Sequence, residues 1–298
     1  MKRRYLLVWG ALSCALCAQD QPLIRFAVLA DIQYADKDTA GARDYRASMD
    51  RLARAVDDLN HHQLAFAIQL GDLIDEGPAN MDPILAAYDR ITARKRHVIG
   101  NHDAAAMDRR ELLKRLGLAN SFYEFAEAGW RFIVLDGTDL SVTGGWPEES
   151  EHFTLGLKML DELKAAKAPN AQDWNGGVGE RQMKWLTAAL QRARQKKERV
   201  IVFGHSPLLA SASTPAHLMW NHLAVRQTLE GSGVVAAYFC GHDHSGGYAI
   251  SRGIHHVTMP GMVEAAEPAY AIVELHPVRL EIHGAGRAPS RTLKTRGR

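Results

Sequence analysis

Five short segments of this 298-residue sequence place possible metal ligands directly after apolar runs. They are Asp31-Ile32-Gln33, Gly71-Asp72, Gly100-Asn101-His102-Asp103, Gly204-His205 and Gly241-His242-Asp243-His244. Carboxylate and amide oxygens and imidazole nitrogens are common protein ligands of divalent metal ions. One such segment alone indicates little, because Gly-Asp after a strand is most often a turn. Five segments of this kind in one chain favour a shared metal site.

The apolar runs before these segments predict the strands of an α/β fold. We expect strands at 24–30, 64–70, 97–99, 131–135, 200–203, 234–240, 254–258, 270–275 and 278–282, and helices at 45–59, 80–94, 108–116 and 180–195. The early part reads as βα units, and the later strands predict an antiparallel or mixed second sheet within one domain. Ligands of α/β sheets bind beyond the carboxyl ends of the strands, so the five segments are expected to meet there.

In this order the five segments resemble the calcineurin-like metallophosphoesterase family, whose pattern is D-x-H, G-D, G-N-H-[ED], H and G-H-x-H. The resemblance runs from Asp31 to His244 and so covers most of the chain. It implies a double β-sheet sandwich flanked by helices, a four-layer α/β/β/α fold. It also implies hydrolysis of phosphate esters or anhydrides with two divalent metal ions and a metal-bridging hydroxide.

The resemblance also assigns roles to individual residues. Asp72 would bridge the two ions; the full ligand sets would be Asp31, Gln33, Asp72 and His244 for the first ion, and Asp72, Asn101, His205 and His242 for the second. His102 matches the family's acid histidine, which stabilises developing charge or protonates the leaving oxygen. Asp103 is expected to orient the His102 ring. Asp75 is expected to orient a ligand or a loop.

Gln33 departs from the family pattern, which has histidine at this position. The tetrapeptide Asp31-Ile32-Gln33-Tyr34 is similar to that of the manganese-dependent ADP-ribose/CDP-alcohol diphosphatase group. So is the segment from Trp174-Asn175-Gly176-Gly177 to Trp185-Leu186. An amide oxygen in place of an imidazole shifts metal preference from Zn²⁺ toward Mn²⁺ or Mg²⁺. We therefore predict Mn²⁺, with Mg²⁺, Fe²⁺ and Zn²⁺ as alternatives.

The substrate is expected to be a small phosphorylated molecule, in particular a nucleoside diphosphate derivative such as ADP-ribose or a CDP-alcohol. Candidate substrate-binding residues are Tyr34, Trp174, Asn175 and Gly176. For Trp174 the alternative is packing in the core ahead of the helix that starts near residue 180. Two other functions stay open: an exported phosphomonoesterase or phosphoprotein phosphatase, and a non-catalytic protein that binds metal or nucleotide on the same scaffold.

The two ends of the chain differ from its body. Residues 1–18 have the basic, apolar and small-residue regions of a signal peptide and predict export, periplasmic or secreted. Residues 19–286 are assigned to the metallophosphoesterase domain and 287–298 to a basic flexible tail. Without the three basic residues of the signal and the five of the tail, the net charge of +2 becomes −6 for the body. That charge argues against nucleic acid as a partner. No stable membrane span is expected after signal cleavage.

Overall fold

The computed structural model describes residues 21–264 and 266–295. Its first sheet has six strands in the order β12-β11-β10-β1-β2-β3. The strands are β1 (Ile24–Leu29), β2 (Phe66–Gln69), β3 (Arg94–His97), β10 (Tyr270–Leu275), β11 (Arg279–Ala285) and β12 (Arg291–Lys294). Strands β1, β2 and β3 run parallel, as expected for βα units, and β10 joins β1 in the antiparallel direction.

The second sheet also has six strands, in the order β4-β5-β6-β7-β9-β8. They are β4 (Tyr123–Glu127), β5 (Trp130–Val134), β6 (Arg199–Phe203), β7 (Val235–Cys240), β8 (Gly247–Ser251) and β9 (Ile254–Thr258). Strands β5, β6, β7 and β9 are parallel, while β4 and β8 form antiparallel edges. The sheet is therefore mixed, one of the two arrangements expected.

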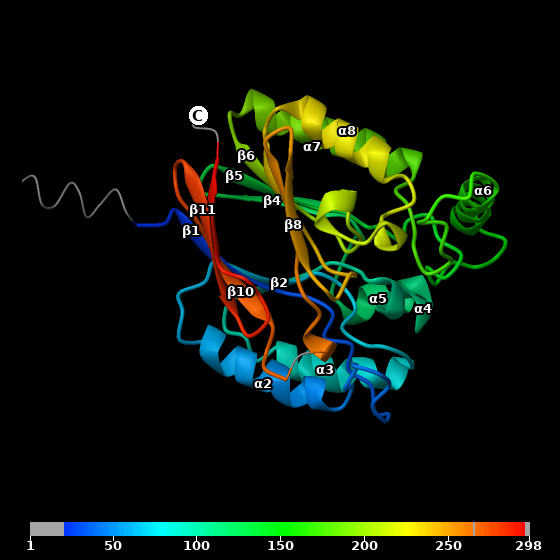
Figure 1. Cartoon of the computed structure of the whole chain (residues 1–298), viewed down its shortest axis with the longest axis horizontal. Coiled ribbons are helices and arrows are strands. Elements are labelled where there is room, and N and C mark those ends of the chain that lie inside the picture. Colours follow the sequence, from blue (N-terminus) through cyan, green and yellow to red (C-terminus); the bar gives the residue numbers. More distant parts are fainter. Residues whose placement is uncertain (1–20, 265, 296–298) are drawn as a thin grey trace, which may run out of the picture.

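Helices cover the outer faces of both sheets, so the molecule has four layers (Figure 1). The helices are α2 (Ala47–Leu59), α3 (Met81–Tyr88), α4 (Asn101–Ala105), α5 (Arg109–Arg115), α6 (Glu151–Ala165), α7 (Glu180–Gln195) and α8 (His222–Ser232). Helices α2 and α3 lie below the first sheet in Figure 1, and α7 and α8 lie above the second. This confirms the expected four-layer fold.

The core between the sheets is rich in phenylalanine. Phe26 of β1 stacks on Phe66 of β2 at 4.8 Å between ring centroids, and both meet Phe132 of β5 edge-on at 5.8 and 5.0 Å. Edge-to-face aromatic pairs add to the stabilisation from buried area. This packing fixes the first sheet against the second, so polar residues at the ends of strands in both sheets face one another across the interface.

Some predicted elements differ from the structure. The helix expected at 80–94 ends at Tyr88, because the chain turns there and begins β3 at Arg94. The strand expected at 97–99 shares only His97 with β3. Strands β4, β8 and β12 and helices α4, α6 and α8 were not predicted.

The prediction that the basic tail is flexible from residue 287 was wrong for the described residues of this segment. Residues 291–294 form β12, which pairs with β11, and Arg287 Nη2 donates to the carbonyl oxygen of His244 at 3.0 Å. The sequence does not reveal this strand, because Leu293 is its only apolar and its only buried residue. The predicted signal peptide lies outside the described residues and stays a prediction. No helix in the described part of the chain is long and apolar enough to cross a membrane.

Candidate active site

The five polar segments meet at the carboxyl ends of β1, β2, β3, β6 and β7, as the sequence predicted. They border a cleft of about 470 Å³. Its lining residues come from four of the five segments, from the end of α4 and from four loops: Gln33, Arg43, Asp72, Asn101, His102, Ala105, Thr143, Trp174, His217, His242 and His244. Asp31 and His205 lie just beneath this surface, both essentially buried.

The backbone at this cleft is strained. Asp31, Gln33, Asp72 and His242 have φ values of 50°, 45°, 57° and 71°, in the left-handed region that side chains rarely adopt. They are half of the eight non-glycine residues with positive φ in the described chain. Strained backbone persists at functional sites because the surrounding structure holds it there. The strain therefore marks the ends of β1, β2 and β7 as the functional centre.

Glycine is required where these segments cross. A Cβ on Gly100 would collide with the carboxylate of Asp72, and a Cβ on Gly241 would collide with that of Asp31. The backbones of two strands thus approach the carboxylates of two others without an intervening side chain. This close approach is what the glycines of the sequence pattern permit.

Three electron-pair donors converge at one corner of the cleft. His205 Nδ1 donates to the carbonyl oxygen of Leu70 at 2.8 Å, which leaves Nε2 facing Asn101 Oδ1 at 2.9 Å. His242 Nε2 donates to Asn175 Oδ1 at 2.8 Å, because the Asn175 amide nitrogen is committed to two carbonyl oxygens. His242 Nδ1 then faces His205 Nε2 at 3.0 Å. Such a convergence of lone pairs needs a cation.

A second group of donors lies on the other side of Asp72. His244 Nδ1 contacts Glu264 Oε1 at 2.8 Å, and its Nε2 lies 3.5 Å from Asp31 Oδ1. Gln33 donates from Nε2 to Asp72 Oδ2 at 3.1 Å, while its buried Oε1 has no hydrogen-bond partner. An unpaired buried oxygen is costly unless something positive completes it. The residues present therefore fit a metal ion here as well.

The pKa values show that the Asp72 carboxylate favours a positive charge on His205 but that burial and His205 disfavour a second one on His242. Burial alone would lower the pKa of His205, but the Asp72 carboxylate raises it to about 9. Burial and the neighbouring His205 hold the pKa of His242 well below its usual value. Burial would raise the pKa of Asp72, but His205 and His102 lower it well below the usual range. A proton on His205 thus supplies, in the absence of metal, the charge that the carboxylate demands.

The structure corrects the expected partner of His102. Its Nδ1 donates to the carbonyl oxygen of Asp75 at 2.9 Å and lies 3.3 Å from the Asp75 carboxylate. Asp103 was expected to orient this ring, but as the third residue of α4 its side chain points back beneath the helix. Its carboxylate accepts four backbone N–H groups, from Asp72, Leu73, Ile74 and Gly100, at 2.8–3.2 Å. Asp103 therefore positions the Asp72 loop, and Asp75 orients His102.

Of the four candidate substrate residues, only Trp174 lines the cleft. Asn175 is buried, and its amide oxygen accepts a hydrogen bond from His242, while Gly176 packs against the carbonyl oxygen of Gly137. Tyr34 pairs with Ile74 in an isolated bridge and contacts the core under the first sheet. None of these three residues lines the cleft, so the structure places them as supports of the site rather than as substrate contacts.

Several site residues were missed by the sequence reasoning. Glu264 holds the His244 ring, and Arg287 holds the His244 backbone. Arg43 and Thr143 line the cleft from loops that carry no ligand motif, and His217 lies 5.1 Å from Trp174 between ring centroids. Of these residues, only Glu264 gave a signal in the sequence, because it is an acidic residue at the end of the loop at 258–264. The others are brought in by loop folding, which spacing along the chain does not reveal.

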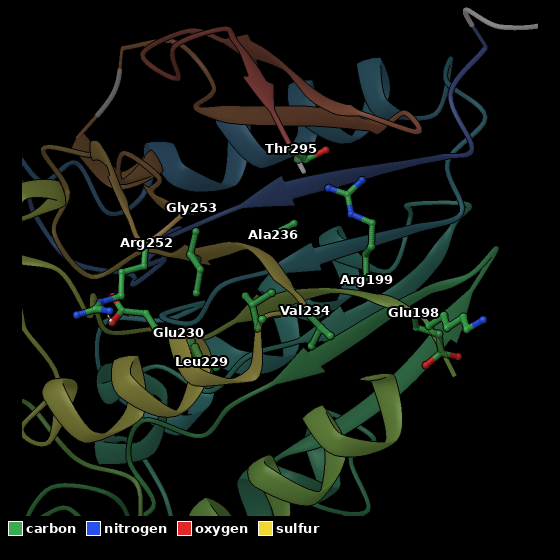
Figure 2. Close-up of a pocket in the computed structure, with 13 residues that line it drawn as sticks. Glu198, Arg199, Leu229, Glu230, Val234, Ala236, Arg252, Gly253 and Thr295 are labelled. Carbon is green, nitrogen blue, oxygen red and sulfur yellow. Dashed lines mark ion pairs between the residues drawn. The ribbon is translucent and has the colours of Figure 1, made fainter. Parts of the chain in front are cut away.

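A second hollow, of about 370 Å³, lies at the opposite ends of the strands (Figure 2). It is bordered by the residues that begin β6, β7 and β9, including Arg199, Val235 and Gly253. Both of its carboxylates are already paired: Glu230 with Arg252 at 3.4 Å, as the figure shows, and with Ser251 at 2.6 Å, and Glu198 with Arg131 at 2.7 Å. No group of three metal-ligating side chains among the described residues lies there. This hollow therefore does not have the group of metal-ligating side chains that the cleft has.

A four-layer fold with oxygen and nitrogen ligands gathered at the strand ends defines a metallophosphoesterase. The chain belongs to the calcineurin-like phosphoesterase family, whose model matches residues 24–246. It is 34% identical over 305 residues to a manganese-dependent ADP-ribose/CDP-alcohol diphosphatase of Arabidopsis thaliana, covering 92% of this chain and 97% of that protein. A protein of the same name from Danio rerio is 32% identical, with 92% and 99% covered.

A solved structure shows the same architecture. The crystal structure of a dimetal phosphatase from Danio rerio matches with a TM-score of 0.86 and 32% identity, covering 93% of this chain and all of that one. The resemblance to this family and to its diphosphatase group, predicted from Gln33 and from the Trp174 segment, is confirmed. The chain is a hydrolase of the metallophosphoesterase class.

Proposed function

We propose that this protein hydrolyses the diphosphate bond of a nucleoside diphosphate derivative, such as ADP-ribose or a CDP-alcohol, with two Mn²⁺ ions. The observation that carries the proposal is the set of lone pairs and carboxylates gathered around Asp72. The names of the relatives at 32–34% identity supply the substrate class and the metal. The lining of the cleft supports this substrate class, because the aromatic ring of Trp174 and the positive charge of Arg43 lie beside the candidate metal ligands.

In this proposal Asp72 lies between the two ions. The first ion would be held by Asp31, Gln33, Asp72 and His244, and the second by Asp72, Asn101, His205 and His242. When bound, two such ions neutralise charge on the phosphoryl group and make a bridging water a hydroxide nucleophile at neutral pH. His205 and His242 must then be neutral, since metal ligation requires the free nitrogen lone pair. Leu70 and Asn175 hold these two rings in the required tautomers.

His102 is proposed to act on the leaving group. The contact of its Nδ1 with the Asp75 carbonyl oxygen requires a proton on Nδ1, which leaves Nε2 free to reach the cleft. A protonated Nε2 can give its proton to the leaving phosphate oxygen or stabilise charge on it. The His102 backbone N–H also donates to Asp72 Oδ1 at 2.9 Å, so the acid and the central carboxylate are held in one unit.

Trp174 and Arg43 are proposed to bind the two parts of the substrate away from the reacting phosphate. Trp174 packs 5.1 Å from His242 and from His217 between ring centroids, forming an aromatic wall beside the ligands. A nucleobase can stack on such a wall. Arg43 lies near Asp75 and Glu264, at 3.9 and 3.8 Å, and is over one-third exposed. Its charge is well placed for the second phosphate.

A substrate panel tests the proposal. With Mn²⁺ we expect the purified protein to hydrolyse ADP-ribose and CDP-choline faster than p-nitrophenyl phosphate. Trp174→Ala should raise KM for both nucleotides roughly 5–100-fold through lost stacking, and leave bis-p-nitrophenyl phosphate hydrolysis nearly unchanged. Trp185→Ala is the matched control, because Trp185 packs on Phe122 and does not line the cleft. Preference for the phosphomonoester would instead support the phosphatase alternative, and no turnover of any substrate would support the binding protein.

Gln33→His is expected to shift metal preference toward Zn²⁺. The substitution replaces the unpaired amide oxygen with an imidazole nitrogen, a ligand that Zn²⁺ favours more than Mn²⁺ does. The measurement is turnover of ADP-ribose with each metal added to the metal-free protein, expressed as the ratio of Zn²⁺ to Mn²⁺ activity. Gln69→His is unsuitable as a control because Gln69 braces Gly71, so Gln63→His on the exposed surface serves instead. An unchanged ratio in Gln33→His would remove Gln33 as the source of the preference.

A further inference from the structure

A second cluster of metal-ligating side chains lies on the hairpin of β10 and β11, on the face turned away from the other sheet. Register places Glu274 directly opposite Glu281. His276 follows Glu274 by two residues, and His283 follows Glu281 by two, so all four side chains share one face. The two carboxylates lie between the two imidazoles along the ladder. None of these residues belongs to the cleft.

The distances within this cluster suit a single ion. His276 Nε2 lies 3.5 Å from Glu274 Oε2 and 3.7 Å from Glu281 Oε2. His283 Nε2 lies 3.4 and 3.8 Å from the same two oxygens. A tetrahedral zinc site with bonds near 2.0–2.1 Å has ligand–ligand edges of roughly 3.3–3.4 Å. One ligand atom each of Glu274, Glu281 and His283 lies within 4.8 Å of the others. His276 Nε2 approaches the same two carboxylate oxygens and would be the fourth ligand.

His276 is the observation that points to a ligand rather than to simple ion pairing. It is only 1% exposed, and neither ring nitrogen has a hydrogen-bond partner. Nearly all buried polar groups in proteins have a partner, because an unpaired one loses its bonds to water. The Nε2 of this ring faces Glu274 and Glu281 at distances beyond those of a normal hydrogen bond. A metal ion between them would satisfy the ring.

Two arginines hold the carboxylates by their other oxygens. Arg25 on β1 contacts Glu274 Oε1 at 2.5–2.7 Å, and Arg279 contacts Glu281 Oε1 at 2.5 Å. Each glutamate therefore keeps its Oε2 turned toward the imidazoles. Such outer contacts orient ligating carboxylates in known metal sites. His283 is about half exposed and gives an ion access from solvent.

We propose that His276, His283, Glu274 and Glu281 form a third metal site, separate from the catalytic pair, for a borderline divalent ion such as Zn²⁺. Two imidazoles and two carboxylates are a ligand set that Zn²⁺ accepts in tetrahedral geometry. The site joins β10 to β11, next to β1, in the sheet that carries Asp31. It acts on the stability of that sheet and takes no part in the reaction.

Metal content tests this site. The full chain is saturated with Mn²⁺, exposed to excess Zn²⁺, desalted, and assayed for total Mn plus Zn per chain, so that exchange at the catalytic centre does not affect the count. We expect three ions in the wild type and two in His283→Ala, which removes a half-exposed ligand and keeps the fold. In competition with a chelator, His283→Ala should bind the third ion at least ~100-fold more weakly. That is the upper end of the loss caused by removing a group that only orients a metal ligand.

Two further variants make the result decisive. His62→Ala removes an exposed histidine that lies 3.7 Å from Asp58, and it should keep three ions. Glu281→Gln keeps the shape of the ligand but removes its charge, and it should lose the third ion as His283→Ala does. Two ions in wild type and in His283→Ala, or an equal loss in His62→Ala, would overturn the proposal. Turnover of ADP-ribose should be unchanged in His283→Ala, so failure of this site is distinct from failure of the proposed function.

Discussion

His102→Ala is expected to lower kcat by a factor on the order of 10²–10⁴ while both catalytic ions stay bound. The variant loses the only side chain that we assign to protonation of the leaving oxygen. It keeps the backbone N–H that donates to Asp72, so the central carboxylate stays in place. Stability should change little, because the imidazole is 28% exposed and makes one short contact, to the Asp75 carbonyl oxygen. The measurements are kcat on ADP-ribose and metal content per chain.

Two comparisons separate this role from a structural one. His62→Ala is the matched control, at an exposed histidine in the turn after α2, and should leave kcat unchanged. The His102→Ala defect should also shrink for substrates with better leaving groups, such as bis-p-nitrophenyl phosphate, because these need less protonation. A variant with normal kcat, or with a defect equal for all leaving groups and a loss of metal, would contradict the assignment of His102 as the acid.

Asp103→Ala is expected to destabilise the protein by on the order of 3 kcal/mol and to reduce metal loading. The carboxylate is fully buried and accepts four backbone N–H groups around Asp72. Removing it leaves several buried donors without a partner, and each such loss costs about 1–3 kcal/mol. For a chain of this size that corresponds to a fall in Tm of about 5–10 °C. Thermal unfolding and metal analysis measure both effects.

Asp108→Ala is the matched control for Asp103→Ala. Asp108 also accepts two backbone N–H groups, as the N-cap of α5, but in an exposed position. Its loss should cost about 1 kcal/mol and leave metal content unchanged. If Asp103→Ala were as stable as Asp108→Ala and bound both ions, the carboxylate would not be the support of the Asp72 loop. A large loss of kcat in a stable, fully metallated variant would restore the catalytic role expected from the sequence.

The sequence was most informative where residues act through their type and their order. Asp31, Gln33, Asp72, Asn101 and the three histidines follow predicted strands, and parallel strands bring their carboxyl ends to one edge of a sheet. That rule placed all seven at one cleft before any contact was known. The same segments carried the resemblance to the family, which implied the four-layer fold, while the apolar runs alone predicted an α/β fold with a mixed or antiparallel second sheet.

The sequence was least informative where a side chain chooses among neighbours. Asp103 follows His102 in the chain, yet the turn of α4 points their side chains apart, and Asp75 takes the imidazole instead. Glu264 and Arg287 reach His244 from segments 20 and 43 residues away. Asn175 reaches His242 across 67 residues. Contacts at such separations depend on how loops pack, and local spacing does not encode that.

The sequence by itself therefore determined the family, the fold class and which polar residues gather at the cleft. Only the tertiary structure decided which group orients each ligand, which nitrogen each histidine presents, and which loops form the walls. The physical reason is that ligand identity depends on side-chain chemistry at the end of a strand, which is local. Orientation depends on hydrogen bonds between distant segments and on the left-handed backbone at Asp31, Gln33, Asp72 and His242, which exists only when the whole fold holds it.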